Sequence, residues 1–175
     1  MDCNFQDADL AKIVTQGCTF TNCDFSGAEL DASRHAVTAF IGCTFDKVGW
    51  RGSALTGCKL TGSVFIDCRC MPWTVRDCDL SMVSFGGAAL KGVDFAGLRM
   101  RGANLVDADL SHADLRNADL TDARLGNARL DKADLRGAQL DDDAWRSAKL
   151  TGTRIDMEQA VRYAQAHGLV FADGS

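Results

Sequence analysis

The sequence predicts an all-β solenoid with four short sides per coil, followed by a short C-terminal helix. Over residues 103–140 a five-residue unit, Ala-[Asp, Asn, Arg or Gln]-Leu-x-x, occurs eight times without interruption. A period of five fits neither an amphipathic helix nor the alternation of a simple strand. A chain that points two residues inward and then turns a corner satisfies it, and repeated corners coil the chain into a solenoid.

The central residue of each unit has a sequence number divisible by five, and between 5 and 155 only Thr15 and His35 are clearly polar. Phenylalanine recurs at this position every 20 residues, which indicates four units per coil and a ladder of stacked rings. The span from 5 to 155 holds 31 units, which at four per coil makes about eight coils. The longer ladder consists of Phe5, Phe25, Phe45, Phe65 and Phe85.

Two other positions of the unit support the same fold. The residue two before the centre is small or apolar almost throughout, as at Cys3, Ala8 and Ala103, so it is predicted to point inward with the centre. The residue two after the centre is often glycine, as at Gly27 and Gly137. Glycine tolerates the backbone conformations that corners need, so this position is predicted to form the corner.

These units resemble the pentapeptide-repeat family over about residues 3–155. The resemblance implies a right-handed quadrilateral parallel β-helix for residues 1–155, with residues 156–175 forming a C-terminal helix and tail. Five further segments resemble the members of this family that bind DNA gyrase and confer fluoroquinolone resistance. They are DCNF at 2–5, GSVF at 62–65, RCMP at 69–72, DMEQAV at 156–161 and AHGL at 166–169.

Length and composition indicate one globular domain. The chain has 175 residues, of which 46% are hydrophobic, enough to fill a core. No apolar run approaches the roughly 20 residues of a membrane span. The first residues lack the basic and apolar regions of a signal peptide, so we expect a cytoplasmic protein without membrane association. The net charge of −5 opposes direct binding to nucleic acid.

The eight cysteines are predicted to fill the core. Cys70 falls at a centre and the other seven fall at the inward position two before it. Free cysteine behaves there as a small hydrophobe, and no C-x₂-C pair occurs. We therefore expect neither a metal nor another cofactor. The seven are Cys3, Cys18, Cys23, Cys43, Cys58, Cys68 and Cys78.

Two places depart from the repeat. Thr15 and His35 are 20 residues apart and so share one side, where they indicate either a local bulge or a partner-binding patch with the apolar outward residues nearby. The only proline, Pro72, has no N–H for a β-ladder. It predicts a kink or bulge in its coil, and the Met71–Pro72 bond is a candidate for the cis form.

The aspartates follow two patterns. An aspartate just before a centre can hydrogen-bond the backbone of the turn, which explains Asp94, Asp114 and Asp134 structurally. Arg116 and Arg136 lie beside them. A second group of aspartates shares one side of the rod. On that side, the two coils that contain most of the group have no Lys or Arg. Like charges held close together repel one another and reduce stability. We interpret this group as a gyrase-binding acidic face, formed by Asp79, Asp119, Asp122, Asp141, Asp142 and Asp143.

After residue 155 the pattern changes to that of a helix. Asp156 is a candidate N-cap and Gly168 a candidate stop, with apolar residues at helical spacing between them. A solenoid exposes its last coil, so this segment caps its own rod or pairs with a second copy. The resemblance implies the second, a homodimer joined through its C-terminal ends. The residues expected there are Met157, Ala160, Val161, Ala164, Leu169, Val170 and Phe171.

The sequence indicates a binding protein and not an enzyme. It contains no Walker A loop, G-x-S-x-G, H-E-x-x-H or dinucleotide-binding fingerprint. A smooth rod is also expected to lack a deep pocket. The resemblance implies a DNA mimic that occupies gyrase in place of duplex DNA. The alternative is a scaffold that displays outward side chains to another protein, and the salt dependence of binding would distinguish the two.

Overall fold

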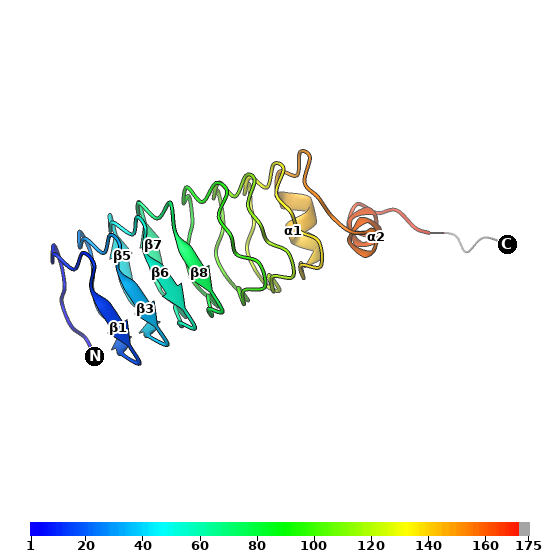
Figure 1. Cartoon of the computed structure of the whole chain (residues 1–175). Coiled ribbons are helices and arrows are strands. Elements are labelled where there is room, and N and C mark those ends of the chain that lie inside the picture. The colour runs from blue at the N-terminus through cyan, green and yellow to red at the C-terminus, as the bar shows by residue number, and fades with distance from the viewer. Residues whose placement is uncertain (172–175) are drawn as a thin grey trace.

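The computed structural model describes residues 1–171 and shows a rod of stacked coils with a helix beyond its C-terminal end (Figure 1). Parallel β-bridges join residues 20 apart along the rod, from Asn4 with Asp24 to Asp134 with Arg154. The predicted fold class is therefore confirmed. The chain is a parallel β-solenoid with four five-residue units in each turn, followed by a short helix.

Within residues 1–171, strands occur only between residues 14 and 76, and each is three residues long. β1, β3, β6 and β8 form a four-stranded sheet on one side of the rod, while β2 pairs with β4 and β5 with β7 on two other sides. The strands are β1 (Val14–Gln16), β2 (Thr19–Thr21), β3 (Arg34–Ala36), β4 (Ala39–Ile41), β5 (Thr44–Asp46), β6 (Ala54–Thr56), β7 (Val64–Ile66) and β8 (Thr74–Arg76).

The core is a column of side chains stacked from coil to coil. Successive rings of the long ladder, from Phe5 to Phe85, lie 4.7–5.1 Å apart between centroids. The second ladder places Phe20 and Phe40 5.2 Å apart. Aromatic pairs at this separation stabilise a core beyond the area that they bury. From Leu105 onward, leucine and alanine fill the column instead and are almost completely buried.

The corners use the left-handed backbone conformation that the glycines predict. Almost every residue two after a centre has a positive φ, from Asp7 (55°) to Gly152 (70°). Two glycines are required for a second reason, because a Cβ at Gly27 or Gly137 would collide with the side chain of the coil before it. Elsewhere asparagine and aspartate often take the same conformation, which short polar side chains adopt more readily than others.

The cysteines mark a second type of corner. At most corners the N–H three residues after the centre donates to the centre's carbonyl, as Ala28 N does to Phe25 O at 2.9 Å. Where that residue is Cys, or Thr as at Thr38, the bond is absent within residues 1–171, and the side chain donates to the carbonyl two residues back. Thr153 is an exception, because its N–H donates to Leu150 O at 3.2 Å and its hydroxyl donates to Leu130 O at 2.7 Å. Cys78 Sγ lies 3.2 Å from Arg76 O. Seven of the eight strands precede such a Cys or Thr, and β5 precedes Val48.

The prediction that all eight thiols fill the core is correct for six of them. Cys23, Cys43, Cys58, Cys70 and Cys78 are buried, and all eight cysteines are free thiols. Cys68 is half-buried and packs against the core, as predicted. The prediction is wrong for Cys18, which is half-buried, and for Cys3, which is exposed. Cys3 belongs to the first coil, which has no neighbouring coil on its outer side to cover it.

The bulge considered at Thr15 and His35 is absent from the backbone. Thr15 pairs with His35, and His35 with Leu55, in the regular register. Both side chains point into the core, where Thr15 Oγ1 lies 2.7 Å from His35 Nδ1 and His35 Nε2 lies 2.9 Å from Ser33 Oγ. Ser33 Oγ in turn donates to Ser53 Oγ at 3.2 Å. The polar residues are tolerated because each is hydrogen-bonded. Burial lowers the pKa of His35 to about 4.

The coil that contains Pro72 departs from the regular pattern, as predicted. The departure is a missing β-bridge and not a bulge with an inserted residue. The Met71–Pro72 bond is cis. On this side of the rod the series of bridges stops at Arg69 and resumes at Ala89, with no bridge between these two residues. The 20-residue register is the same before and after the break.

Two helices end the chain. The predicted helix is α2 (Met157–Ala166), with Asp156 as its N-cap. The other, α1 (Asp142–Ser147), was not predicted and replaces one side of the last coil. Asp143 falls at the inward position that in every other unit holds an uncharged residue. A lone carboxylate cannot be buried there, and its side chain is 96% exposed in α1.

Candidate functional site

The predicted acidic face is only partly a cluster of free charges. Arg99 Nε lies 3.4 Å from an Asp79 carboxylate oxygen, and Arg101 lies 2.8 Å from Asp122. Both arginines come from coils next to these aspartates on the same side of the rod. The prediction considered only the two coils that contain most of the group, and it therefore overestimated how acidic this face is.

Three aspartates of the face, Asp119, Asp141 and Asp142, have no cation within 4.0 Å among residues 1–171. We call them the unpaired aspartates. Asp119 Oδ1 accepts from the N–H and the hydroxyl of Thr121 at 3.1 and 2.6 Å. Asp141 Oδ2 accepts from the Asp122 N–H at 2.5 Å, which joins two adjacent coils. Two of these carboxylates are therefore held in place by the backbone.

Helix α1 extends the acidic face around the corner of the rod. Asp142 and Asp143 form its first turn, and Asp143 lies 3.5 Å from Arg146 in the last turn. An open groove of about 680 Å³ runs between α1 and the preceding coil, with Asp122, Asp141 and Asp143 among its lining residues. The structure thus brings five of the six predicted aspartates to one region, while Asp79 lies two coils away.

The second row of aspartates is neutralised at two of its three members, Asp114 and Asp134, whereas Asp94 has no cation within 4.0 Å among residues 1–171. Arg116 and Arg136 each contact the aspartate two residues before them, at 2.6 and 2.7 Å. Arg154 lies 3.7 Å from Asp134 on the other side. The Arg136 hydrogen bond is the main reason why the pKa of Asp134 falls to about 2. This row stabilises the surface and offers few free charges to a partner.

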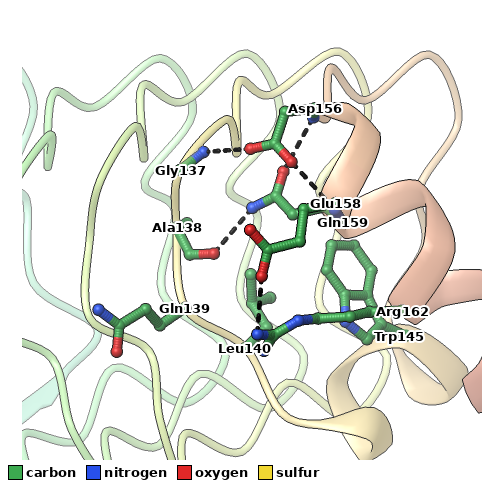
Figure 2. Close-up of a pocket in the computed structure, with 9 residues that line it drawn as sticks. All are labelled: Gly137, Ala138, Gln139, Leu140, Trp145, Asp156, Glu158, Gln159 and Arg162. Carbon is green, nitrogen blue, oxygen red and sulfur yellow. Dashed lines mark hydrogen bonds and ion pairs between the residues drawn. The ribbon is translucent and has the colours of Figure 1, made fainter.

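The junction between the last coil and α2 is fixed by two side chains (Figure 2). Asp156 accepts from Gln159 N and Gly137 N, at 3.0 and 2.8 Å. Gln159 is buried and donates to the carbonyls of Leu135 and Ala138, at 2.6 and 2.7 Å. These two carbonyls would otherwise face a missing next coil. A cavity of about 300 Å³ lies beside these bonds.

The residues expected at a dimer interface lie on the outer side of this junction. Met157 is 81% exposed, and Leu169, Val170 and Phe171 are 62%, 90% and 55% exposed. Ala160, Val161 and Ala164 are half-buried. Helix α2 does not seal the rod, because a cavity of about 150 Å³ opens between Tyr163 and the last core residues, Trp145, Leu150 and Ile155. The rod therefore ends in an apolar opening, and an exposed apolar segment follows α2.

Residues 1–171 contain no group of three or more His, Cys, Asp and Glu side chains that could hold a metal ion. Within the same residues no helix is both long and apolar enough to cross a membrane.

Comparison with known proteins identifies the repeat. The family model for pentapeptide repeats matches residues 1–34, 75–107 and 108–142, with eight copies. The chain is also 54% identical to the pentapeptide repeat protein MfpA of Mycobacterium tuberculosis over 171 residues, which cover 98% of this chain and 93% of the relative. This chain belongs to the pentapeptide-repeat family.

Two further similarities agree with this assignment. A segment of 42 residues, 24% of this chain and 22% of the relative, is 50% identical to MfpA of Mycolicibacterium smegmatis. Among solved structures, QnrB1, a plasmid-mediated fluoroquinolone resistance protein, superposes with a TM-score of 0.75 over 97% of this chain and 95% of its own. At 19% identity that structure supports the pentapeptide-repeat fold alone.

Several functional residues were missed from the sequence, although signals for them exist. Gln159 completes a capping box with Asp156, which the spacing Asp-x-x-Gln could have indicated. Arg99 and Arg101 lie 20 and 21 residues before Asp119 and Asp122, so the coil register could have paired them with this face. Helix α1 was signalled by a charged residue at the inward position 143.

Proposed function

We propose that this pentapeptide-repeat chain binds DNA gyrase in the cytoplasm as a rigid rod in place of duplex DNA. Such binding would inhibit or modulate the enzyme and give resistance to fluoroquinolones. The proposed activity is binding and not catalysis. The observation that carries the proposal is the 54% identity to MfpA over nearly the whole chain, together with the family resemblance in the repeats and the C-terminal segment.

The geometry is compatible with this role but limits its mechanism. Duplex DNA carries one charge per roughly 1.7 Å of its axis, far more densely than a chain of net charge −5. A mimic of this kind would therefore depend on a few well-placed carboxylates and not on its overall field. The unpaired aspartates Asp119, Asp141 and Asp142 fit that requirement, because they are exposed or partly exposed and lie close together.

The test is supercoiling by purified gyrase from the same organism with increasing amounts of this protein. The variant Asp119→Asn/Asp141→Asn/Asp142→Asn removes the three unpaired charges while keeping side chains that can accept the same hydrogen bonds. The control Asp67→Asn/Asp77→Asn/Asp107→Asn removes the same charge at exposed corners with φ of 48°, 53° and 59°, which asparagine also accepts.

We expect wild type and control to inhibit supercoiling and the acidic-face variant to lose inhibition, with binding that weakens steeply as salt rises. If both variants inhibit equally, gyrase is the partner but the acidic face is not the site. If none of the three proteins binds or inhibits gyrase, the gyrase proposal is wrong and the scaffold alternative takes its place.

We further propose that two copies join through their C-terminal ends. The exposed segment Leu169–Phe171 and the open cavity at Leu150 and Ile155 are each apolar, and a second copy would cover both at once. Mutual burial by the same surface on both copies is the usual geometry of a two-fold dimer. It would also bring both sets of unpaired aspartates toward the middle of a longer rod.

The dimer is tested by sedimentation velocity. Val170→Asp/Phe171→Asp is expected to give a monomer, because it places charges in an apolar interface. Ile66→Asp/Met82→Asp is the matched control, since these side chains are 45% and 64% exposed far from α2. A monomeric wild type, or a dimer in both variants, would contradict the proposed interface.

A further inference from the structure

The N-terminal half of the rod carries an exposed surface that the proposed function does not use. It lies on the outward face of the four-stranded sheet and on the neighbouring side that contains β2 and β4. Val14 and Val37 are each 69% exposed and Ile41 is 39% exposed. Three basic side chains lie among them. We call this surface the N-terminal cationic face and define it by Val14, Arg34, Val37, Ile41, Lys59 and Arg76.

The three cations of this face are unbalanced. Within residues 1–171, Arg34, Lys59 and Arg76 have no carboxylate within 4.0 Å, whereas most arginines after residue 98 are paired. The units that build these two sides, at 13–22, 33–42, 53–62 and 73–82, contain three basic and two acidic residues. The acidic residues are Asp77 and Asp79, and Asp79 bridges to Lys59 through the backbone while its carboxylate lies 3.4 Å from Arg99. A protein of net charge −5 thus keeps a local positive surface here.

The face also has a shallow recess. A groove of about 160 Å³ lies over Ala36 and Ala54, whose small side chains form its floor, and Val14 and Arg34 are at its wall. A recess of this size suits one apolar side chain, with a charged group beside it. The backbone beneath is fixed, because β1, β3 and β6 pair in register and Thr15 and His35 are hydrogen-bonded below them.

We propose that the N-terminal cationic face binds an acidic segment of a protein partner. One apolar side chain of that segment occupies the recess over Ala36 and Ala54, and its carboxylates pair with Arg34, Lys59 and Arg76. The charge of the face requires an acidic partner, and its exposed valines and isoleucine require one with apolar side chains. A DNA duplex presents mainly charged phosphates and sugars on its outside and is repelled by the net negative charge of the rod.

This surface is separate from the unpaired aspartates and from the C-terminal end, although Asp79 of the acidic face borders it next to Lys59. It lies in the coils before residue 77, whereas the unpaired aspartates begin at Asp119. The inference therefore does not depend on gyrase binding. It also agrees with the second hypothesis for the Thr15 and His35 region, which was a partner-binding patch. The cationic face lies on the outer surface of the strands that carry Thr15 and His35 on their inner side.

The experiment is an NMR titration of the isotopically labelled full chain with an acidic peptide that carries one central leucine. A second peptide has serine in place of the leucine, and a DNA duplex is the third ligand. The test variant is Arg34→Glu/Lys59→Glu/Arg76→Glu. The matched control is Arg124→Glu/Lys132→Glu/Lys149→Glu, which changes the charge equally at exposed cations without an ion pair in the described residues.

We expect the leucine peptide to shift the amides of β1, β3, β6 and β8, and the serine peptide to bind several-fold more weakly. The test variant should lose about tenfold or more in affinity, while the control should change little. Three results would overturn the proposal: no binding to wild type, an equal loss in both variants, or shifts confined to other coils. Tighter binding of the duplex than of the peptide at this face would also reject it.

Discussion

The aromatic half of the rod, residues 5–95, and the alanine–leucine half, residues 103–140, share one register but differ in almost every other respect. The first contains the eight strands and the phenylalanine ladders. It also contains seven hydrogen bonds made by buried polar side chains, including those of His35. The second has isolated bridges, a core of leucine and alanine, and a surface rich in ion pairs. A regular sequence is therefore not needed for a regular coil.

The difference teaches what the coil requires. Each unit must bury its centre and the residue two before it, and each corner must adopt a positive φ. Within these limits the corner has two hydrogen-bonding patterns, a backbone bond at most corners and a side-chain bond where cysteine, or threonine at Thr38, follows the corner. The core also accepts polar groups, provided that each finds a partner in a neighbouring coil, as Ser53 does with Leu30 O at 2.7 Å.

The largest effect is expected from truncating the two cores. Phe45 is completely buried between rings 5.1 and 4.8 Å away, and Leu120 is completely buried among leucines. Phe45→Ala should reduce the free energy of unfolding by about 4 kcal/mol and Leu120→Ala by about 3 kcal/mol, since both leave cavities. Urea denaturation followed by circular dichroism measures both. Phe45→Leu is the control and should lose much less. A larger loss for Leu120→Ala would mean that the alanine–leucine half dominates stability.

The second prediction concerns acid sensitivity of the aromatic half. Burial lowers the pKa of His35 to about 4 from 6.5, so the unfolded chain takes up a proton that the folded chain resists. The stability contribution is complete above pH 6.5 and is lost as the pH falls toward 4. The loss is roughly 2 kcal/mol by pH 5 and roughly 3 kcal/mol by pH 4.

His35→Leu separates this effect from the titration of carboxylates. Leucine fits a column that already holds Leu55 in the next coil. The difference in unfolding free energy between pH 7 and pH 5 should be smaller in the variant than in wild type by about the amount assigned to His35. Hydrogen exchange should place the acid-sensitive opening in β1 and β3. An unchanged pH dependence would show that His35 does not control it.

The repeat itself could be predicted from the sequence, because each five-residue unit carries its own signal and errors do not accumulate. The long phenylalanine ladder, the 20-residue turn and Asp156 as N-cap all follow from local spacing. Side-chain contacts between coils were harder to predict. Arg101 reaches Asp122 and Gln159 reaches Ala138, and both depend on long side chains whose direction the repeat does not specify. Helix α1 was missed because one charged inward residue overrides an otherwise intact pattern.

A smaller effect is expected at the corners. Cys78 Sγ lies 3.2 Å from Arg76 O and 3.6 Å from Leu55 O, and it accepts from the Cys58 N–H at 3.3 Å. Cys78→Ala removes all three contacts and leaves a small cavity. We expect a loss of about 1–2 kcal/mol in the free energy of unfolding. Cys78→Thr keeps a donor like that of Thr38, which lies 3.1 Å from Ala36 O, and should lose less. Equal losses would mean that a hydroxyl donor does not replace the thiol at this corner.

The smallest effect distinguishes the two rows of aspartates. Asp134 is held by Arg136 at 2.7 Å, and its pKa of about 2 lies below 3.8, so its contribution is present above pH 3.8 and is lost as the pH falls to 2. Asp134→Asn should reduce the free energy of unfolding at pH 7 by no more than about 1 kcal/mol, because solvent screens the pair.

Asp119→Asn should leave stability at pH 7 nearly unchanged, because asparagine can still accept from the Thr121 N–H and hydroxyl and no cation is left without a partner. Thermal unfolding of both variants at neutral and acidic pH measures the difference. If Asp119→Asn destabilised the rod as much as Asp134→Asn, the carboxylate of Asp119 would be structural, and the case for the unpaired aspartates as a binding surface would weaken. A stable Asp119→Asn variant leaves its charge free for a partner.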